Sequence, residues 1–398
     1  KHIFLPYVTQ GEPHDDKFKR SVFCPYNISF PSIAKTAGLE KPEGKEILTA
    51  VVNFQFDLDT IARLLMDGLS RTFKLNKGAV KHAWTAAIAE HHNFQNQLQE
   101  IGANYLKKLE DEGSDGVVIL GRAYNVCDMG ANLNLPQKIA DLELTALPVD
   151  MLPISDVKVD KLYENMYWRY GRKILQAATF VAKHPRLHAV FLTNFGCGPD
   201  SFLQSYVERI MHGKPMLMLE LDEHSADAGY VTRLEAFKDV ICRDKNKDES
   251  IAKNKEEIKF HPSVFKRSHE IDNLWMPPMH PYGTSFLAAA LRNDGMPAKP
   301  LPKETLETFE LAKRYCRGTE CVPLPSTIGA FLNVLNNSKN PNREAFFMPT
   351  AKGPCRFGQY NTLQRMILSE AGYKDVHIES WDDGSGNFGL KPKTSLNV

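Results

Sequence analysis

One short apolar run decides the fold expected for this chain, Gly116-Val117-Val118-Ile119-Leu120-Gly121. A few branched aliphatic residues between two glycines predict a short strand that is buried on both faces. Further apolar runs follow at 147–152, 189–193 and 215–221, and amphipathic helical segments separate them. Because strands of this kind alternate with helices, we expect a parallel sheet covered by helices on both faces.

The flanking regions continue this pattern. Upstream, residues 3–5 and 47–56 are strand candidates, and residues 57–73 and 78–112 have the apolar spacing of helices. Between the strands of the central region, helices are expected at 163–183 and 201–212. Downstream, we expect strands at 274–277, 345–349 and 376–378 and helices at 285–292, 321–335 and 359–371.

This order of elements predicts four parts of the chain. Residues 1–112 form a partial α/β segment with a long helix, and residues 113–243 form an α/β domain. Residues 244–259 form a linker rich in both Lys/Arg and Asp/Glu, a composition typical of a solvated boundary. Residues 260–398 form a second α/β domain that ends early. Because the chain begins on a strand and stops soon after one, we expect it to be a piece of a longer polypeptide.

Composition excludes several classes of protein. Apolar residues make up 42% of the 398 residues and charged residues 24%, which is typical of a globular protein. Lys and Arg number 49 against 48 Asp and Glu, so no overall basic field favours nucleic acid or an anionic membrane. No apolar run approaches the roughly 18 residues of a membrane-spanning helix, and the N-terminus lacks the pattern of a signal peptide.

The cysteines indicate a reducing compartment. There are seven of them, an odd number spread thinly along the chain, so we expect a cytoplasmic protein without disulfide bonds. Cys24, Cys197, Cys321 and Cys355 have Gly or Pro close by, which predicts that these thiols lie on loops. Cys242 follows Val240 and Ile241, and there we expect a buried, structural cysteine.

Two of these loops share one design. Residues 190–200 and 346–358 each read as an apolar strand, a cysteine near glycines, and the start of a helix. Loops after parallel strands line the crevice where α/β sheets bind ligands, and a helix N-terminus stabilises a thiolate. Metal ligation or nucleophilic attack suits Cys197 and Cys355 in such a place. A cysteine that only fills a tight turn is about as good an explanation.

The chain also resembles a known family in a set of short segments that occur in family order over nearly its whole length. It is similar to the large bacterial CoA-substrate-specific enzyme activases, related to the activator of 2-hydroxyacyl-CoA dehydratases. The similar part is the region that resembles dehydratase subunits and double-cubane-cluster proteins. The matching segments are Phe23-Cys24-Pro25, 118–124, 194–198, 219–225, Glu320-Cys321-Val322-Pro323 and 353–360.

The resemblance implies tandem Rossmann-like, flavodoxin-like three-layer domains with mainly parallel sheets, plus a long helical arm. It also implies an iron–sulfur cluster, either 4Fe-4S or double-cubane, with Cys24, Cys197, Cys321 and Cys355 as ligands. In such systems an ATP-hydrolysing, actin-like activator passes a low-potential electron to the cluster protein, which drives reduction or dehydration of a CoA ester or small molecule. A homodimer is compatible with this assignment.

The sequence departs from the family pattern in ways that bear on function. The cysteine loop expected before Cys24 is absent, and Asn125-Val126-Cys127-Asp128 replaces an acidic, histidine-containing stretch. The phosphate-binding loops of the ATPase are not present, so we expect no ATP hydrolysis by these residues and an incomplete cluster or none. Two alternatives stay open: a non-catalytic CoA-ester-binding or scaffold module whose cysteines only pack, and an enzyme with a thiol nucleophile.

Overall fold

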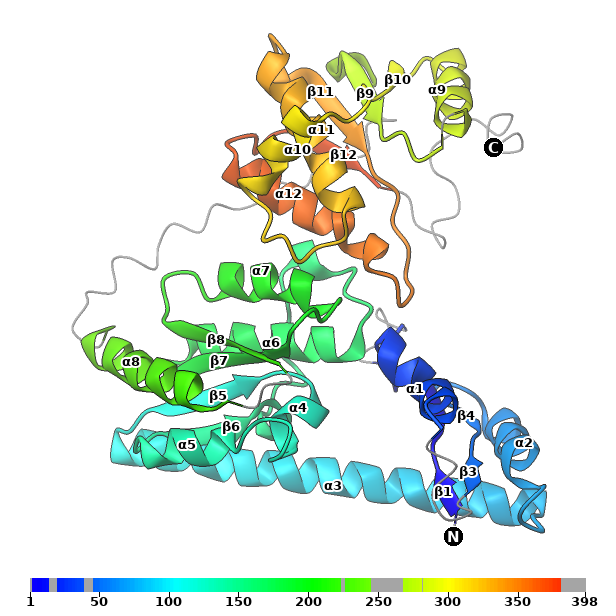
Figure 1. Cartoon of the computed structure of the whole chain (residues 1–398), viewed down its shortest axis with the longest axis vertical. Coiled ribbons are helices and arrows are strands. Elements are labelled where there is room, and N and C mark those ends of the chain that lie inside the picture. The colour runs from blue at the N-terminus through cyan, green and yellow to red at the C-terminus, as the bar shows by residue number, and fades with distance from the viewer. Residues whose placement is uncertain are drawn as a thin grey trace. The chain divides into compact units, whose positions relative to one another are not determined.

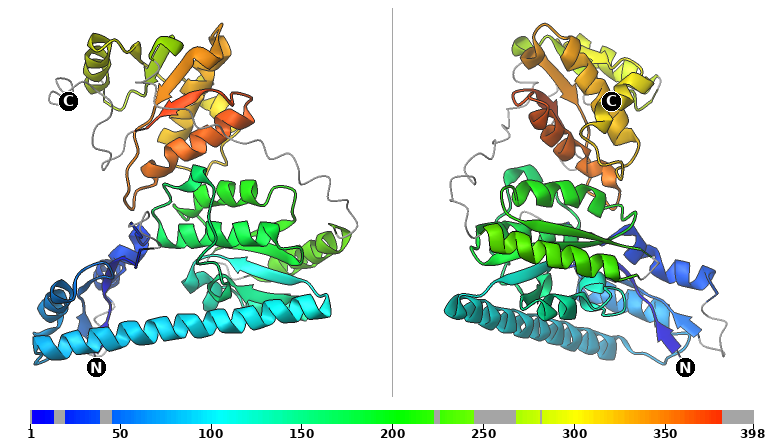
Figure 2. Two further views of the ribbon diagram at one scale, coloured as in Figure 1. Left: turned by 180° about the vertical axis from the view of Figure 1, so that it is seen from behind. Right: turned by 60° about the vertical axis from the view of Figure 1, so that its left-hand side comes forward.

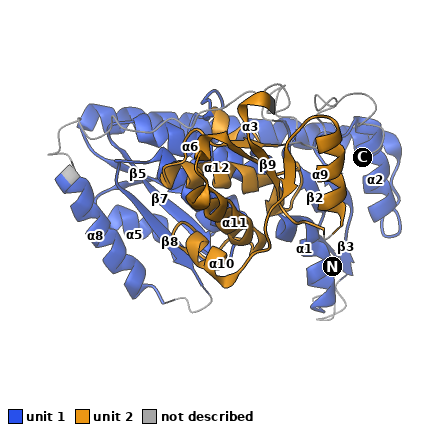
Figure 3. Ribbon diagram, turned by 90° about the horizontal axis from the view of Figure 1, so that it is seen from above, with its two compact units in different colours: residues 1–160, 166–253 blue, residues 161–165, 254–398 orange. Residues whose placement is uncertain are grey.

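The computed structural model of the chain divides into two compact units (Figures 1 and 3). It describes residues 2–13, 20–38, 46–222, 226–244, 268–280 and 282–380. Unit 1 comprises residues 1–160 and 166–253, and unit 2 comprises residues 161–165 and 254–398. The expected charged linker at 244–259 lies almost entirely outside the described residues, as do Glu223, His224 and Ser225.

The centre of unit 1 is a four-stranded parallel sheet. Its strands are β5 (Gly116–Leu120), β6 (Thr145–Pro148), β7 (Leu187–Asn194) and β8 (Met216–Leu221), in the spatial order β6-β5-β7-β8. Every neighbouring pair is parallel. All five residues of β5 are buried, because helices cover both faces of this strand. The sequence prediction of a buried parallel sheet is therefore confirmed.

Helices form a layer on each face of this sheet (Figures 1 and 2). On one face α5 (Leu135–Asp141) and α8 (Ala228–Asp244) pack Leu135, Ile139, Leu234 and Phe237 against Val117 and its neighbours on the strands. The other face is covered by α6 (Arg169–Lys183) and α7 (Asp200–Ile210), whose buried side chains include Leu175 and Phe202. The short helix α4 (Ala123–Cys127) follows β5 directly. This arrangement is the three-layer α/β fold that the resemblance implies.

The N-terminal part of unit 1 is a parallel ribbon with its own helices. β1 (His2–Phe4) pairs with β3 (Glu46–Leu48), and β2 (Tyr7–Gln10) pairs with β4 (Val51–Asn53). The chain crosses between the two sides of the ribbon through α1 (Pro25–Thr36) and leaves through α2 (Leu58–Leu69). Asp57 caps α2 by accepting hydrogen bonds from the amides of Asp59 and Thr60.

The long helix α3 (Lys77–Glu112) runs the length of unit 1 and connects the ribbon to the sheet (Figures 1 and 2). Its N-terminus is capped by Asn76, and Gly113 ends it in the left-handed conformation. Gly102 is the point of closest approach to the rest of the unit, because a Cβ atom placed there would lie 1.9 Å from the carbonyl oxygen of Met151. No helix in the described ranges is long and apolar enough to cross a membrane.

Unit 2 repeats the sheet topology of unit 1. Its strands are β9 (Asn273–Met276), β10 (Ala298–Pro300), β11 (Glu344–Phe347) and β12 (His377–Glu379). They are all parallel and follow the spatial order β10-β9-β11-β12, so both sheets place their first strand between the second and the third. This is the beginning of the flavodoxin-like strand order. The tandem Rossmann-like architecture implied by the resemblance is thus seen in both units.

Helices also cover both faces of the second sheet. On one face α9 (Gly283–Asn293) packs Ala288 and Leu291 against β9 and its neighbours. The other helices are α10 (Leu306–Lys313), α11 (Pro323–Asn337) and α12 (Tyr360–Glu370). Phe331 of α11 stacks on Phe346 of β11, with ring centroids 4.1 Å apart, which fixes α11 on the sheet.

Several boundaries differ from the sequence predictions for physical reasons. The strand expected at 47–56 is divided into β3 and β4, because its partner strand is interrupted at Pro6, which has no amide hydrogen to donate. Helix α6 begins at Arg169 rather than at residue 163, because residues 161–165 belong to unit 2. Residues 25–36, for which no helix was predicted, form α1 despite an internal proline, Pro31.

The contact at Gly102 gives a stability prediction. We expect Gly102→Ala to destabilise unit 1 by about 1–3 kcal/mol, because the added methyl group has no room beside Met151 and α3 must shift. The matched control is Gly78→Ala near the start of the same helix, where the nearest atom lies 3.5 Å from the added Cβ. That variant should be neutral or slightly stabilising, since Ala favours helix more than Gly does. Urea unfolding followed by circular dichroism measures both, and equal midpoints for the two variants would contradict the packing described here.

Candidate functional site: two pairs of thiols

The first candidate site lies at the carboxyl edge of the sheet of unit 1. The loops after β5 and β7 meet there, because the strand order reverses between these two strands. The β5 loop carries Arg122 and Tyr124, and the β7 loop carries Cys197. Gly196, with a φ of 68°, gives the β7 loop a turn that favours glycine and leads into Cys197. The sequence therefore places Cys197 in the crevice where sheets of this class bind ligands.

A buried ion pair joins the two loops. Nη2 of Arg122 lies 2.5 Å from Oδ1 of Asp200, and each side chain is 1% exposed. The other carboxylate oxygen of Asp200 accepts a hydrogen bond from the Thr193 hydroxyl over 2.6 Å. Burial alone would lower the pKa of Arg122, but the attraction of Asp200 holds that pKa above its ordinary value. The guanidinium is thus permanently charged and held beside the Cys197 loop.

Cys24 reaches the same place from the N-terminal ribbon. The amide of Val22 donates to the carbonyl of Tyr167, and the amide of Arg169 donates back to Val22. This bridge fixes Cys24 next to the start of α6. The thiol of Cys24 caps α1 by accepting a hydrogen bond from the Asn27 amide over 3.4 Å, and it is buried.

Tyr124 lies near both thiols of unit 1. Burial raises the pKa of the Tyr124 hydroxyl, Arg122 lowers it, and both Cys24 and Cys197 raise it further. Two cysteines separated by more than a hundred residues therefore lie within electrostatic range of one phenol group. Cys24 and Cys197 thus both lie near the Tyr124 hydroxyl, and their role as metal ligands stays a prediction.

The other two predicted cysteines form a matching pair in unit 2. Burial raises the pKa of the Tyr360 hydroxyl, as do a hydrogen bond with the Cys321 thiol and the nearby Cys355 thiol. The two loops are also tied directly, because Nη1 of Arg356 donates to the carbonyl of Thr319 over 3.2 Å. Each unit thus holds two cysteines, one tyrosine and one arginine at a single place.

A short segment of chain closes the Cys355 loop. The side-chain amide of Asn165 donates to the Thr350 hydroxyl and to the Gly358 carbonyl, each over 2.8 Å. In return, the side-chain amide of Gln359 donates to the Asn165 carbonyl over 2.7 Å. The Thr350 hydroxyl also donates a hydrogen bond to the Gly358 carbonyl. These contacts hold the two ends of the loop together, so the position of Cys355 does not depend on its own side chain.

The two pairs have equivalent places in their sheets. In each unit one cysteine follows the third strand of the sheet, Cys197 after β7 and Cys355 after β11. The other cysteine lies at the start of the helix that leads into that strand. Cys321 directly precedes α11 in the chain, whereas Cys24 is brought to α6 by the ribbon. Because the placement is repeated, a shared role of the four cysteines explains it better than four cysteines that each only fill a tight turn.

Sequence reasoning missed part of the site. Tyr124, Tyr360 and Arg122 were not predicted as site residues, although Arg122 and Tyr124 directly follow a predicted strand. Cys242, predicted to be buried, is exposed on α8, so that prediction is wrong. Each thiol pair has no third metal-ligating side chain beside it in the part of the chain that the structure describes.

Comparison with protein families connects this geometry to known proteins. Residues 1–152 match the family model described as CoA enzyme activase uncharacterised domain (DUF2229). This match covers less than half of the chain, and over these residues the chain is similar to CoA enzyme activases. The matched region contains Cys24 and Tyr124 and ends before Cys197. Searches of curated proteins and of solved structures found no match.

The environment of Cys197 predicts an unusual pH dependence. Burial and the carboxylate of Asp200 raise the pKa of this thiol to about 12, and Arg122 only partly opposes them. Because the raised pKa keeps the thiol protonated, alkylation of Cys197 by iodoacetamide should still rise about tenfold per pH unit between pH 8 and 10.

Mass spectrometry of the labelled peptide measures this rate. In urea the alkylation rate of the same cysteine should level off as the pH passes the ordinary thiol pKa of about 8.5. A native rate that levels off below pH 9 would contradict the described environment.

Proposed function

We propose that this activase-related chain is an iron–sulfur electron-transfer or reductase module. In this proposal Cys24 with Cys197, and Cys321 with Cys355, each supply two thiolate ligands to an iron–sulfur cluster of the 4Fe-4S or double-cubane type. The observation that carries the proposal is that four cysteines distant in the chain are gathered into two equivalent pairs, each beside a tyrosine and an arginine.

The metal-ligating and hydrogen-bonding groups around each pair supply part of what such a cluster needs. Iron–sulfur clusters take cysteine thiolates, usually four, so each pair fits half of a ligand set. All four cysteines also lie next to the N-terminus of a helix, whose dipole favours a negative group. In unit 1 the Nε atom of Arg122 is buried and has no hydrogen-bond partner among the described residues. A donor of this kind suits the sulfur atoms of a cluster, which accept hydrogen bonds that tune the cluster potential.

The properties of Cys197 favour metal ligation over nucleophilic catalysis. A nucleophile needs a thiolate near neutral pH, but burial and Asp200 keep this thiol protonated. A metal ion displaces that proton directly and makes the thiolate stable at neutral pH. The fixed positive charge of Arg122 then offsets part of the charge of the thiolate.

The family assignment suggests where the electron comes from and where it goes. We propose that an ATP-hydrolysing, actin-like activator, in the same polypeptide or as a partner, reduces the cluster. The electron then drives reduction or dehydration of a CoA ester or another small molecule. The residues of this chain would hold the cluster, and the activator would supply the energy.

Anaerobic reconstitution with iron and sulfide tests this proposal on the full chain. We expect bound iron, acid-labile sulfide and a broad visible absorption band. Cys24→Ser with Cys197→Ser should remove the iron held in unit 1, and Cys321→Ser with Cys355→Ser should remove that held in unit 2. Cys242→Ser, an exposed thiol on α8, is the matched control and should leave the iron content unchanged.

Two results would contradict the proposal. One is a reconstituted chain that binds no iron while its circular dichroism shows that it is folded. The other is an iron content that the four cysteine substitutions do not reduce. Either result would favour the alternative of a non-catalytic CoA-ester-binding or scaffold module with structural cysteines.

A further inference from the structure

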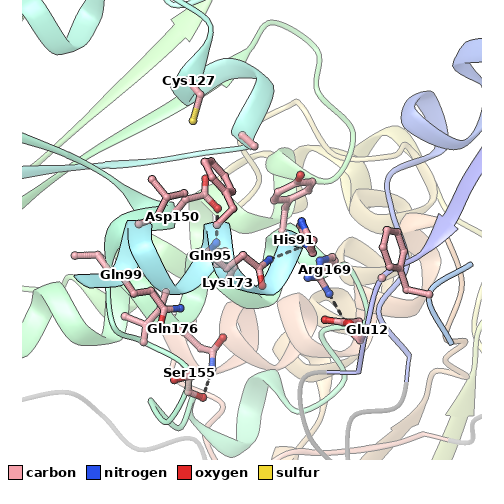
Figure 4. Close-up of a pocket in the computed structure, with 18 of the residues that line it drawn as sticks. Glu12, His91, Gln95, Gln99, Cys127, Asp150, Ser155, Arg169, Lys173 and Gln176 are labelled. Atoms are coloured by element: carbon pink, nitrogen blue, oxygen red, sulfur yellow. Dashed lines mark hydrogen bonds and ion pairs between the residues drawn. The ribbon is translucent and has the colours of Figure 1, made fainter. Parts of the chain in front are cut away.

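A cavity of about 680 Å³ lies inside unit 1, separate from the thiol pairs (Figure 4). Its walls come from four parts of the unit: the N-terminal ribbon with the loop after it, the middle of α3, the short helix α4, and the start of α6 with the segment after β6. The volume is in the range of small-molecule binding sites. Its polar wall includes Arg169, Lys173 and Asp150, and its apolar wall includes Phe23 and Phe54.

Arg169 is a partly buried cation in this wall. Its Nη1 donates to the carbonyl of Glu12 over 2.9 Å and to the hydroxyl of Ser21 over 3.4 Å. Both acceptors are uncharged, and no carboxylate of the described residues forms an ion pair with this guanidinium. Burial lowers the pKa of Arg169, the nearby Tyr170, Glu12 and Asp150 oppose this shift, and the guanidinium stays charged at neutral pH.

The carboxylates in the wall are already bound to other groups. Asp150 forms an ion pair with Lys173, and the carboxylate of Glu12 contacts Nε2 of His92 over 2.7 Å (Figure 4 shows the first of these). Neither carboxylate forms an ion pair with Arg169, although the charges of both raise the pKa of its guanidinium. Arg169 also begins α6, which has no side-chain cap, so the positive end of that helix adds to the charge at this wall.

Aromatic rings line the rest of the cavity. Phe23 meets Tyr170 edge to face, with centroids 5.9 Å apart, and Phe54 lies 6.2 Å from the ring of His91. The side-chain amide of Gln95 is bonded to His91, and Gln99 on the next turn of α3 also faces the cavity (Figure 4). His91 is exposed and also forms part of this wall.

We propose that the cavity binds a small organic monoanion, a free carboxylate with an aromatic or other apolar body. The carboxylate pairs with Arg169, whose described hydrogen bonds go only to the uncharged Glu12 carbonyl and Ser21 hydroxyl. The body packs against Phe23, Phe54 and Tyr170. The inference does not depend on bound iron, because Cys24 and Cys197 do not line the cavity.

Isothermal titration calorimetry with the full chain tests the proposal. The probes are 3-phenylpropionate and its uncharged amide, which has nearly the same shape. A charge-assisted hydrogen bond to Arg169 should make the acid bind at least about tenfold more tightly than the amide. Arg169→Gln should remove most of this preference, whereas Arg63→Gln, at an exposed position on α2, should leave it unchanged.

A second pair of variants tests the cavity without removing a charge. Gln99→Trp fills the space and should weaken binding of the acid at least tenfold. Gln97→Trp, at an exposed position on the same helix, should bind like the unchanged chain. The proposal is overturned if the acid does not bind at millimolar concentration, if acid and amide bind equally well, or if Gln99→Trp retains full binding. Circular dichroism confirms in each case that the variant is folded.

Discussion

The buried ion pair between Arg122 and Asp200 is the constraint on which the first site depends. It links the end of β5 to the start of α7, and through Thr193 it also fixes the end of β7. Two charges that are each 1% exposed have lost nearly all their hydration, so they remain stable only when paired. The loops after β5 and β7 are therefore held in one arrangement, and the positions of Tyr124 and Cys197 follow from it.

A pair of cysteines is placed on each of two similar sheets by different means. In unit 2 the loop positions come from backbone and amide contacts, with Asn165 closing the Cys355 loop. In unit 1 the segment directly before α6 has no cysteine that corresponds to Cys321 of unit 2. The N-terminal ribbon supplies Cys24 at this place instead. The ribbon and α3 thus do more than extend the domain, because they complete one site and build the cavity beside it.

Much of the fold follows from local sequence pattern, and much of the site does not. Strand β5 and helix α3 were predicted within a residue, because each has a strong apolar pattern with glycine or a capping residue at its ends. Cys242 lies one residue off the buried stripe of α8 formed by Leu234, Phe237 and Ile241, and a short apolar run does not resolve that difference. The approach of Cys24 to Tyr124 depends on tertiary contacts that no local pattern encodes. The four cysteine assignments rested on family resemblance, and their role as ligands stays a prediction.

The central claim is that the Arg122–Asp200 pair shapes the first site, and a single comparison of unfolding free energies tests it. Asp200→Asn keeps the shape of the side chain but leaves the buried guanidinium without a counter-charge, and we predict a loss of about 3–5 kcal/mol. Asp272→Asn, which breaks the exposed pair with Arg343, should cost at most about 1 kcal/mol. Equal, small losses in the two variants would show that the buried pair is not the constraint described here.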